Sequence, residues 1–147
     1  MTTDQSLHAQ VCFALHSASR ATTAAYRGLL EDLGLTYPQY LVLVALWERD
    51  GRGVGELCTA LDLDTGTLSP LLKRLEAQGL VERRRQRADE RRVDIHLTDA
   101  GRAMQARASS IPARLAEATG LSPAELDGLR STLDRLRAGL AEVAPQP

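Results

Sequence analysis

The hydrophobic period of the chain changes at Leu80, and this change constrains the fold more than any other feature of the sequence. Before it, apolar residues recur at helical spacing between a capping residue, Asp64, and a terminating glycine, Gly79. The buried side of this helix is predicted to consist of Leu68, Leu71, Leu72 and Leu75. After it, apolar and polar residues largely alternate over 80–84 and over 93–97, which predicts two strands. The sequence therefore predicts a capped helix and then a β-hairpin. Pro70 lies inside this helix and removes one backbone hydrogen bond, and local rules alone would suggest a break there.

The remaining segments are predicted to be helical. A long first helix carries an apolar stripe and ends at Gly34, a second covers about 38–50, and a short third about 55–61. The glycine-rich run GRGVG separates the second from the third and is predicted to be a turn. Thr98 begins a further helix that Pro112 is expected to kink. Ser122 caps a last helix, whose apolar residues over 126–143 alternate spacings of three and four, as in helices that pair.

These elements predict a mainly α fold with a small β-hairpin, in a single domain over residues 1–147. A short helix, a turn, a capped helix and a basic hairpin make up a winged helix-turn-helix over about 38–97. The flanking helices, 5–33 and 98–144, both carry apolar stripes, so we expect them to form a helical dimerisation layer. A composition of 44% hydrophobic and 25% charged residues suits a folded domain of this length.

Charge is concentrated on one segment although the net charge of the chain is only −1. Residues 73–92 contain eight basic and four acidic side chains, whereas 1–72 contain four and eight. On the open side of the capped helix, short hydroxyls and two long cations can reach DNA bases and phosphates: Thr65, Thr67, Ser69, Lys73 and Arg74. The hairpin supplies Arg83, Arg84, Arg85, Arg87, Arg91 and Arg92. We therefore expect double-stranded DNA as the partner. A winged helix that binds only protein would leave this basic segment unexplained.

Several classes of protein are disfavoured by the sequence. The longest apolar run, 41–47, is too short to span a bilayer, and no signal peptide is recognised, so we expect a cytoplasmic protein without membrane partners. Two cysteines cannot form a disulfide framework, and a reducing compartment would leave both thiols free. Three scattered histidines and two distant cysteines lack the spacing of metal ligands, so neither a metal nor another cofactor is expected.

The stretch DERRVDIHLTDAG, residues 89–101, resembles the signature of MarR-type (multiple antibiotic resistance) transcriptional regulators. Asp89 and Arg91, followed by Leu97, Thr98 and Gly101, have the spacing of that family. The resemblance implies a homodimeric repressor in which each subunit reads half of a near-palindromic operator. It also implies that Asp89 orients Arg91 and that Arg91 enters the minor groove.

Further blocks are similar to the organic hydroperoxide resistance regulators, a peroxide-sensing branch of that family. They are QVCFALHSASRATTAAYR (10–27), GLTYPQYLVLVALWE (34–48) and LDTGTLSPLLKRLEAQGLVERR (63–84). The resemblance implies that Cys12 is the sensing thiol and that tyrosines, some from the partner subunit, donate hydrogen bonds to it. Tyr26 and Tyr37 match two such positions, while His16 replaces a third tyrosine. No cysteine follows Cys58, so the chain resembles the members with one reactive cysteine.

The residues themselves suggest the corresponding chemistry. A thiolate attacks a peroxide and becomes a sulfenic acid, which a low-molecular-weight thiol could convert to a mixed disulfide. His16 follows Cys12 by four residues, so the two could form a thiolate–imidazolium pair. Cys58, between apolar residues on a short helix, is interpreted as a core residue. Two alternatives stay open: a MarR-type repressor that responds to a small aromatic ligand, with Cys12 incidental, and, more weakly, a thiol peroxidase. We expect a regulator rather than an enzyme, because no peroxidase motif is present.

Overall fold

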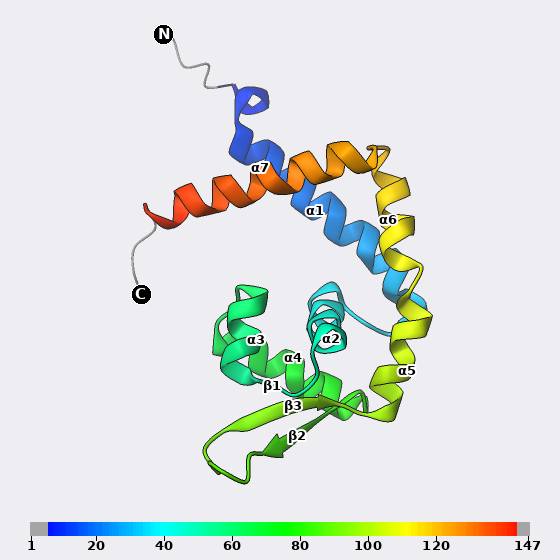
Figure 1. The fold of residues 1–147 in the computed structure, drawn as a ribbon. Coiled ribbons are helices and arrows are strands. Elements are labelled where there is room, and N and C mark those ends of the chain that lie inside the picture. The colour runs from blue at the N-terminus through cyan, green and yellow to red at the C-terminus, as the bar shows by residue number, and fades with distance from the viewer. Residues whose placement is uncertain (1–5, 144–147) are drawn as a thin grey trace. The chain divides into compact units, whose positions relative to one another are not determined.

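The computed structural model describes residues 6–143, the side chain of His8 excepted. The chain divides into two compact units between Ser109 and Ser110, and each is described by itself. The helices of the first unit are α1 (Val11–Leu30), α2 (Tyr37–Glu48), α3 (Val54–Leu61), α4 (Thr65–Ala77) and α5 (Asp99–Ala108). Two short 3-10 turns, η1 (Leu7–Ala9) and η2 (Glu31–Leu33), flank α1 (Figure 1). The second unit holds α6 (Ile111–Thr119) and α7 (Pro123–Ala141).

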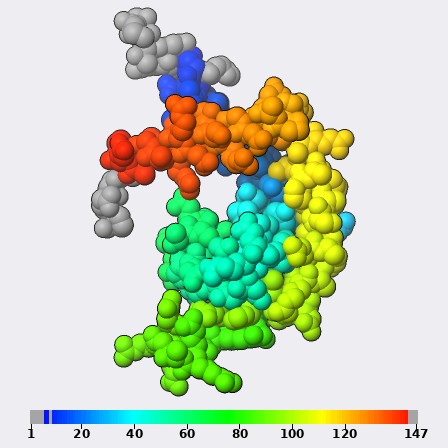
Figure 2. Space-filling view, viewed as in Figure 1, coloured from blue at the N-terminus to red at the C-terminus, as the bar shows by residue number. Residues whose placement is uncertain are grey.

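A small antiparallel sheet belongs to the first unit. Its strands are β1 (Arg52–Gly53), β2 (Val81–Arg85) and β3 (Val93–Leu97), in the order β1-β3-β2. The wing, residues 81–97, consists of β2, β3 and the tip between them, with Val81 opposite Leu97 at its base. Figure 2 shows the wing, in green, standing out from the rest of this unit. The mainly helical fold with a small β-hairpin is thus confirmed, and a third, two-residue strand is added to the hairpin.

The core of the first unit lies among α2, α3, α4 and the sheet. The three leucines Leu68, Leu72 and Leu75 of α4 are almost completely buried, as the helical spacing predicts, while Leu71 is half-buried. Helix α4 contacts α2 and α3, whose side chains Leu43, Leu46 and Leu57 are at most 1% exposed. Burying these side chains leaves the opposite side of α4 free to face a partner.

Helix boundaries follow the capping residues in the sequence. The Asp64 side chain accepts the Thr67 N–H at 2.6 Å, and Thr98 accepts the Gly101 N–H at 3.1 Å. Ser122 and Glu125 form a capping box at α7. A second capping box, between Thr36 and Gln39, starts α2 at Tyr37, one residue before the predicted Pro38. Each of these side chains satisfies a backbone N–H that the first turn of the helix leaves free.

Three local predictions were wrong in detail. The GRGVG run is not only a turn, because Arg52 and Gly53 pair with Ile95 and Asp94 of β3 as β1. The helix that begins after Thr98 is not kinked at Pro112 but ends at Ala108, and Pro112 lies in the first turn of a new helix. The first helix is also shorter than predicted, because η1 and η2 replace its ends. Gly34, with φ at +65°, closes η2 as a left-handed cap.

The exposed apolar residues lie toward the two ends of the chain. Leu7, Val11, Phe13 and Leu15 are between 37% and 70% exposed in the first unit. In the second unit the exposed large apolar side chains are Leu121, Leu129, Leu133, Leu140 and Val143. Neither α7 nor the first nineteen residues of α1 contain a buried side chain. The outermost residues of the predicted dimerisation helices, Gln5 and Ala144, lie outside the described part of the chain.

Candidate functional site

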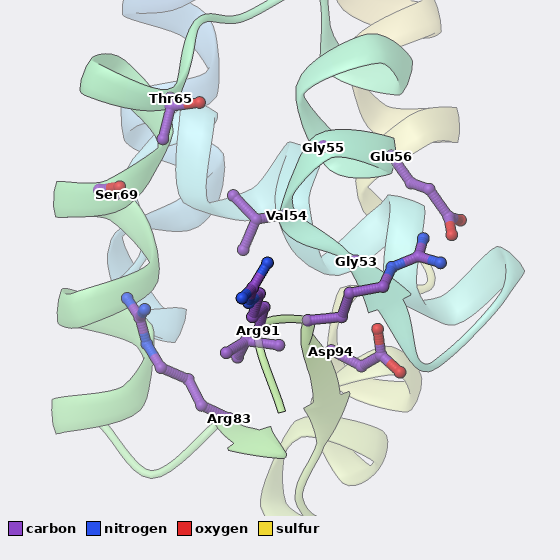
Figure 3. A pocket seen from close by; sticks show the side chains of 11 residues that line it. Gly53, Val54, Gly55, Glu56, Thr65, Ser69, Arg83, Arg91 and Asp94 are labelled. Atoms are coloured by element: carbon purple, nitrogen blue, oxygen red, sulfur yellow. The ribbon is translucent and has the colours of Figure 1, made fainter. Parts of the chain in front are cut away.

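A groove of about 500 Å³ separates α4 from the wing. Thr65 and Ser69 line it from α4, and Gly53, Val54, Gly55 and Glu56 line it from β1 and the start of α3. Arg83, Arg91 and Arg92 line it from the wing, together with Asp94 (Figure 3). Hydroxyls and guanidinium groups therefore face one open groove, an arrangement that suits the phosphates and base edges of a nucleic acid.

The predicted binding residues on α4 fall into two groups. Thr65 and Ser69 line the groove, whereas Thr67, Lys73 and Arg74 are exposed on α4 but do not line it. The cap at Asp64 orders the first turn that carries Thr65 and Thr67. The hydrogen bonds that Asp64 receives from Thr67 lower the pKa of its carboxyl group, so it stays ionised at neutral pH.

The wing arginines also differ in their partners. Arg83 is paired with Glu76 of α4, and Arg84 with Glu82 of its own strand. The other four are exposed and form no ion pair within the described part of the chain: Arg85, Arg87, Arg91 and Arg92. These four guanidinium groups are therefore available to a polyanion without breaking a contact inside the chain.

The tip of the wing is ordered by its own hydrogen bonds. The Asp89 carboxylate accepts the backbone N–H of Arg91 at 3.0 Å, and the Asp89 carbonyl accepts the N–H of Arg92 at 3.0 Å. Gln86 donates from Nε2 to Asp94 Oδ2 at 2.7 Å and so ties the two sides of the tip together. Asp89 thus contacts the main chain of Arg91, which leaves the Arg91 guanidinium free.

Cys12 and His16 lie on α1 and both are exposed. Cys12 is the second residue of the helix, and His16 follows it one turn later. Among the described residues neither side chain has a hydrogen bond or ion pair. The spacing therefore allows the two side chains to come into contact, but no hydrogen bond or ion pair connects them in the described part of the chain.

The predicted tyrosines form a cluster of their own. The rings of Tyr26 and Tyr37 are stacked with centroids 4.2 Å apart, and Tyr40 lies 5.9 Å from Tyr26. Tyr26 follows Cys12 by fourteen residues on one helix, which corresponds to about 21 Å along its axis. The cluster is therefore too far from Cys12 of the same chain for a hydrogen bond between them.

Burial changes the acidity of the tyrosine cluster. It raises the pKa of Tyr26 to about 12, with the neighbouring Tyr37 and Tyr40 contributing, and it also raises the pKa of Tyr37 and of Tyr40. All three side chains therefore remain neutral phenols, able to donate a hydrogen bond, throughout the physiological range. Tyr40 was missed in the sequence, although it follows Tyr37 by three residues and so shares its side of α2.

Cys58 differs from its interpretation as a core residue. It is half-exposed, and its Sγ lies 3.8 Å from Oγ1 of Thr65 at the start of α4. Within the described residues, no group of three or more histidine, cysteine or acidic side chains is placed to hold a metal ion. No helix in that part of the chain has the length and apolar character needed to cross a bilayer.

Comparison with known proteins identifies the family. The family described as transcriptional regulator SarA/Rot matches residues 24–107, more than half of the chain. The HTH-type transcriptional regulator TtmR of Methylorubrum extorquens is 50% identical over 95% of this chain and 74% of its own length. The organic hydroperoxide resistance transcriptional regulator of Bacillus subtilis is 43% identical over 86% of each chain. The structure of reduced AbfR bound to DNA has a TM-score of 0.79 and 35% identity, and covers 93% of this chain and 94% of its own. The chain therefore belongs to the SarA/Rot family of MarR-type transcriptional regulators.

Proposed function

We propose that this regulator is a dimeric repressor that binds near-palindromic operator DNA and releases it when an organic hydroperoxide oxidises Cys12. The observation that carries the DNA-binding part is the groove, which Thr65 and Ser69 of α4 line together with Arg91 and Arg92 of the wing. In this arrangement α4 enters the major groove and the wing reaches the adjacent minor groove. The DNA-bound AbfR relative supports the same partner.

Dimerisation is supported by the exposed apolar residues. In the first unit Leu7 and Val11 are 57% and 70% exposed, and in the second unit Leu129 and Leu140 are 46% and 53% exposed. Exposed apolar side chains of this kind often mark a surface that binds another protein. We propose that α1, α5, α6 and α7 take part in covering them with a second copy of the chain. A dimer presents two copies of α4 at a fixed separation, which sets the half-site spacing of the operator.

The proposed sensing step begins with the Cys12 thiolate. Its sulfur attacks one peroxide oxygen, the O–O bond breaks, and the other oxygen leaves with a proton as the alcohol. The net reaction converts a thiol and a hydroperoxide into a cysteine sulfenic acid and an alcohol. A low-molecular-weight thiol then condenses with the sulfenic acid, forming a mixed disulfide and releasing water. Cys12 is exposed in the single chain, so only the partner subunit limits the access of both reactants.

The tyrosine cluster contributes to this step only across a dimer. The spacing along α1 separates Tyr26 from Cys12 of the same chain, so a phenol that donates to the thiolate has to come from the partner subunit. We propose that the neutral hydroxyls of Tyr26 and Tyr37 act in this way. A bulky group on Cys12 then pushes against the partner subunit, changes the separation of the two α4 helices and lowers the affinity for the operator.

A second candidate function is a repressor released by a small aromatic ligand. It is favoured by an open hollow of about 450 Å³ between α1 and the start of α2, lined by Arg27, Gly28, Glu31 and Thr36 among others. An aromatic carboxylate could place its ring against Leu35 and its charge near Arg27. In this case Cys12 would have no part in release.

One gel-shift experiment separates the two candidates. The wild-type chain first selects duplexes from a random DNA pool, and the preferred duplex is then bound and challenged with cumene hydroperoxide, hydrogen peroxide or an aromatic acid. The peroxide-sensing proposal expects release by cumene hydroperoxide at concentrations where the aromatic acid has no effect. Release by the aromatic acid, with no response to cumene hydroperoxide, would select the second candidate. Failure to select any duplex would contradict both.

A further inference from the structure

The Asp50 side chain joins three elements at the base of the wing. Its Oδ1 accepts the backbone N–H of Leu97 at 2.8 Å and that of Gly51 at 2.9 Å. Its Oδ2 accepts from the Arg102 guanidinium of α5 at 3.3 Å. Since Asp50 follows α2, Leu97 ends β3 and Arg102 belongs to α5, one carboxylate connects the end of α2, the wing base and the next helix.

The register of the sheet explains why the Leu97 N–H is bonded by a side chain rather than by the main chain of a neighbouring strand. In the pairing of β1 with β3, Arg52 lies opposite Ile95 and Gly53 opposite Asp94, so continuing the register places Asp50 opposite Leu97. The main chain does not continue the ladder there, and the Asp50 carboxylate accepts the Leu97 N–H in its place. Gly51, which lies between Asp50 and Arg52 in the chain, has φ at +71°. A Cβ atom at Gly51 would lie 2.8 Å from Cε1 of His96. The local backbone is therefore shaped so that the carboxylate reaches β3.

The wing extends away from this attachment. Val93, where β3 begins, lies four residues from Leu97, or about 13 Å at the rise of a strand, and the arginines of the tip lie beyond it. A tilt of about 10° at the base would move Val93 by about 2 Å over that length. Such a displacement is large enough to break a direct hydrogen bond from a wing arginine to DNA.

We propose that Asp50 is a positioning residue of the DNA-binding surface: it fixes the wing base and so sets where Arg91 meets DNA relative to α4. This inference rests on the proposed function for the DNA contact. The effect of Asp50 on the stability of the wing can, however, be measured without DNA. Asp50 itself does not line the groove, and no DNA contact is assigned to it.

The chain offers a matched control in Asp99. Its Oδ1 accepts from the same guanidinium, that of Arg102, at 3.3 Å, but its side chain has no bond to β3. Asp50→Asn and Asp99→Asn each remove one negative charge beside Arg102, although Oδ2 of Asp50 also lies 3.9 Å from Nδ1 of His96. Only Asp50→Asn also weakens the attachment at Leu97, because a neutral amide holds neither Arg102 nor two N–H groups as well as a carboxylate does.

The experiment measures hydrogen exchange in residues 81–97 of the free protein and binding of the selected duplex by fluorescence anisotropy. We expect Asp50→Asn to accelerate exchange in the wing about tenfold and to weaken binding about tenfold, while Asp99→Asn stays within about twofold of the wild type in both. Asp50→Asn should weaken binding less in an Arg91→Ala background than in the wild type, whereas its effect should multiply fully with that of Ser69→Ala on α4.

Equal wing exchange in Asp50→Asn and Asp99→Asn would overturn the inference, and so would an effect of Asp50→Asn that multiplies fully with Arg91→Ala. If the wild type prefers no duplex over a scrambled one, the proposed function fails instead. The exchange measurement in the free protein then still decides whether Asp50 holds the wing.

Discussion

Arg83 of the wing donates from Nε to Oε2 of Glu76 on α4 at 3.1 Å, so an ion pair bridges the two sides of the groove. Both side chains are more than a third exposed, which limits the contribution of the pair to stability to about 0–1 kcal/mol. The pair does occupy the Arg83 guanidinium. It therefore distinguishes Arg83 from Arg91, which carries the same charge on the same wing but has no ion-pair partner among residues 6–143.

Arg91→Ala should weaken operator binding by about 1–3 kcal/mol and reduce its salt dependence, because a free guanidinium is lost from the DNA surface. Arg83→Ala should weaken binding less, since Arg83 has to leave Glu76 before it reaches a phosphate. Anisotropy titrations over a series of salt concentrations measure both effects. A larger loss in Arg83→Ala than in Arg91→Ala would contradict this assignment of the wing.

Gly101 should tolerate no side chain. A Cβ atom at this position would lie 2.1 Å from the carbonyl oxygen of Leu80, where α5 packs directly on the residue before β2. Gly101→Ala should lower the free energy of unfolding by about 1–3 kcal/mol through overpacking. Gly128→Ala on α7 is the matched control: nothing lies within 4 Å of its Cβ position, and alanine favours the helix. Urea denaturation compares the two, and equal midpoints would contradict the packing described.

The raised pKa of Tyr26 predicts a loss of stability at alkaline pH. Its folded value, about 12, lies above the ordinary value of 10.0, so folding disfavours the phenolate. The contribution of neutral Tyr26 to the free energy of unfolding is complete below pH 10 and is lost as the pH rises toward 12. Tyr26→Phe cannot ionise, and its urea midpoint should therefore fall less than that of the wild type across this interval. Parallel declines in both proteins would show that Tyr26 ionises equally easily in the folded and unfolded states.

His16 supplies a test of how the thiol is activated. His16 follows Cys12 by one helical turn, so its ring could interact with the thiolate, and a tyrosine at that position could donate a hydrogen bond in its place. If His16 assists Cys12, His16→Ala should slow the reaction with cumene hydroperoxide near neutral pH, and His16→Tyr should restore much of the rate. Stopped-flow measurements across pH 5–8 give the three profiles. Superimposable curves would leave His16 without a role in sensing.

Much of the winged helix could be predicted because its signals are local. The leucine spacing and the Asp64 cap define α4, and the alternation after Leu80 defines the wing. β1 could not be predicted in this way, since two residues carry no alternation and their pairing depends on β3, about forty residues later. Pro70 lies inside α4 without ending it. It is exposed, while the buried leucines on the other side of the helix hold α4 in place.

The candidate sites were predictable to different degrees. Residue type and helical spacing indicated Thr65, Ser69 and Arg91, which the fold brings to one groove. The same reasoning could not separate Arg83 from Arg91, because the ion pair with Glu76 depends on how β2 crosses α4. Asp50 carries no signal in the sequence, since its role depends on the register of β1 with β3. The resemblance already implied tyrosines from a partner subunit, and the distance along α1 between Cys12 and Tyr26 agrees with that proposal.

The most direct test follows two quantities in one titration of the wild-type chain on its selected duplex with cumene hydroperoxide. Mass spectrometry gives the fraction of Cys12 oxidised, and anisotropy gives the fraction of duplex released. We predict that the two curves coincide, that Cys58→Ser behaves like the wild type, and that Cys12→Ser stays bound at every peroxide concentration. Release of the duplex while Cys12 remains a thiol, or full oxidation of Cys12 with the duplex still bound, would contradict this prediction.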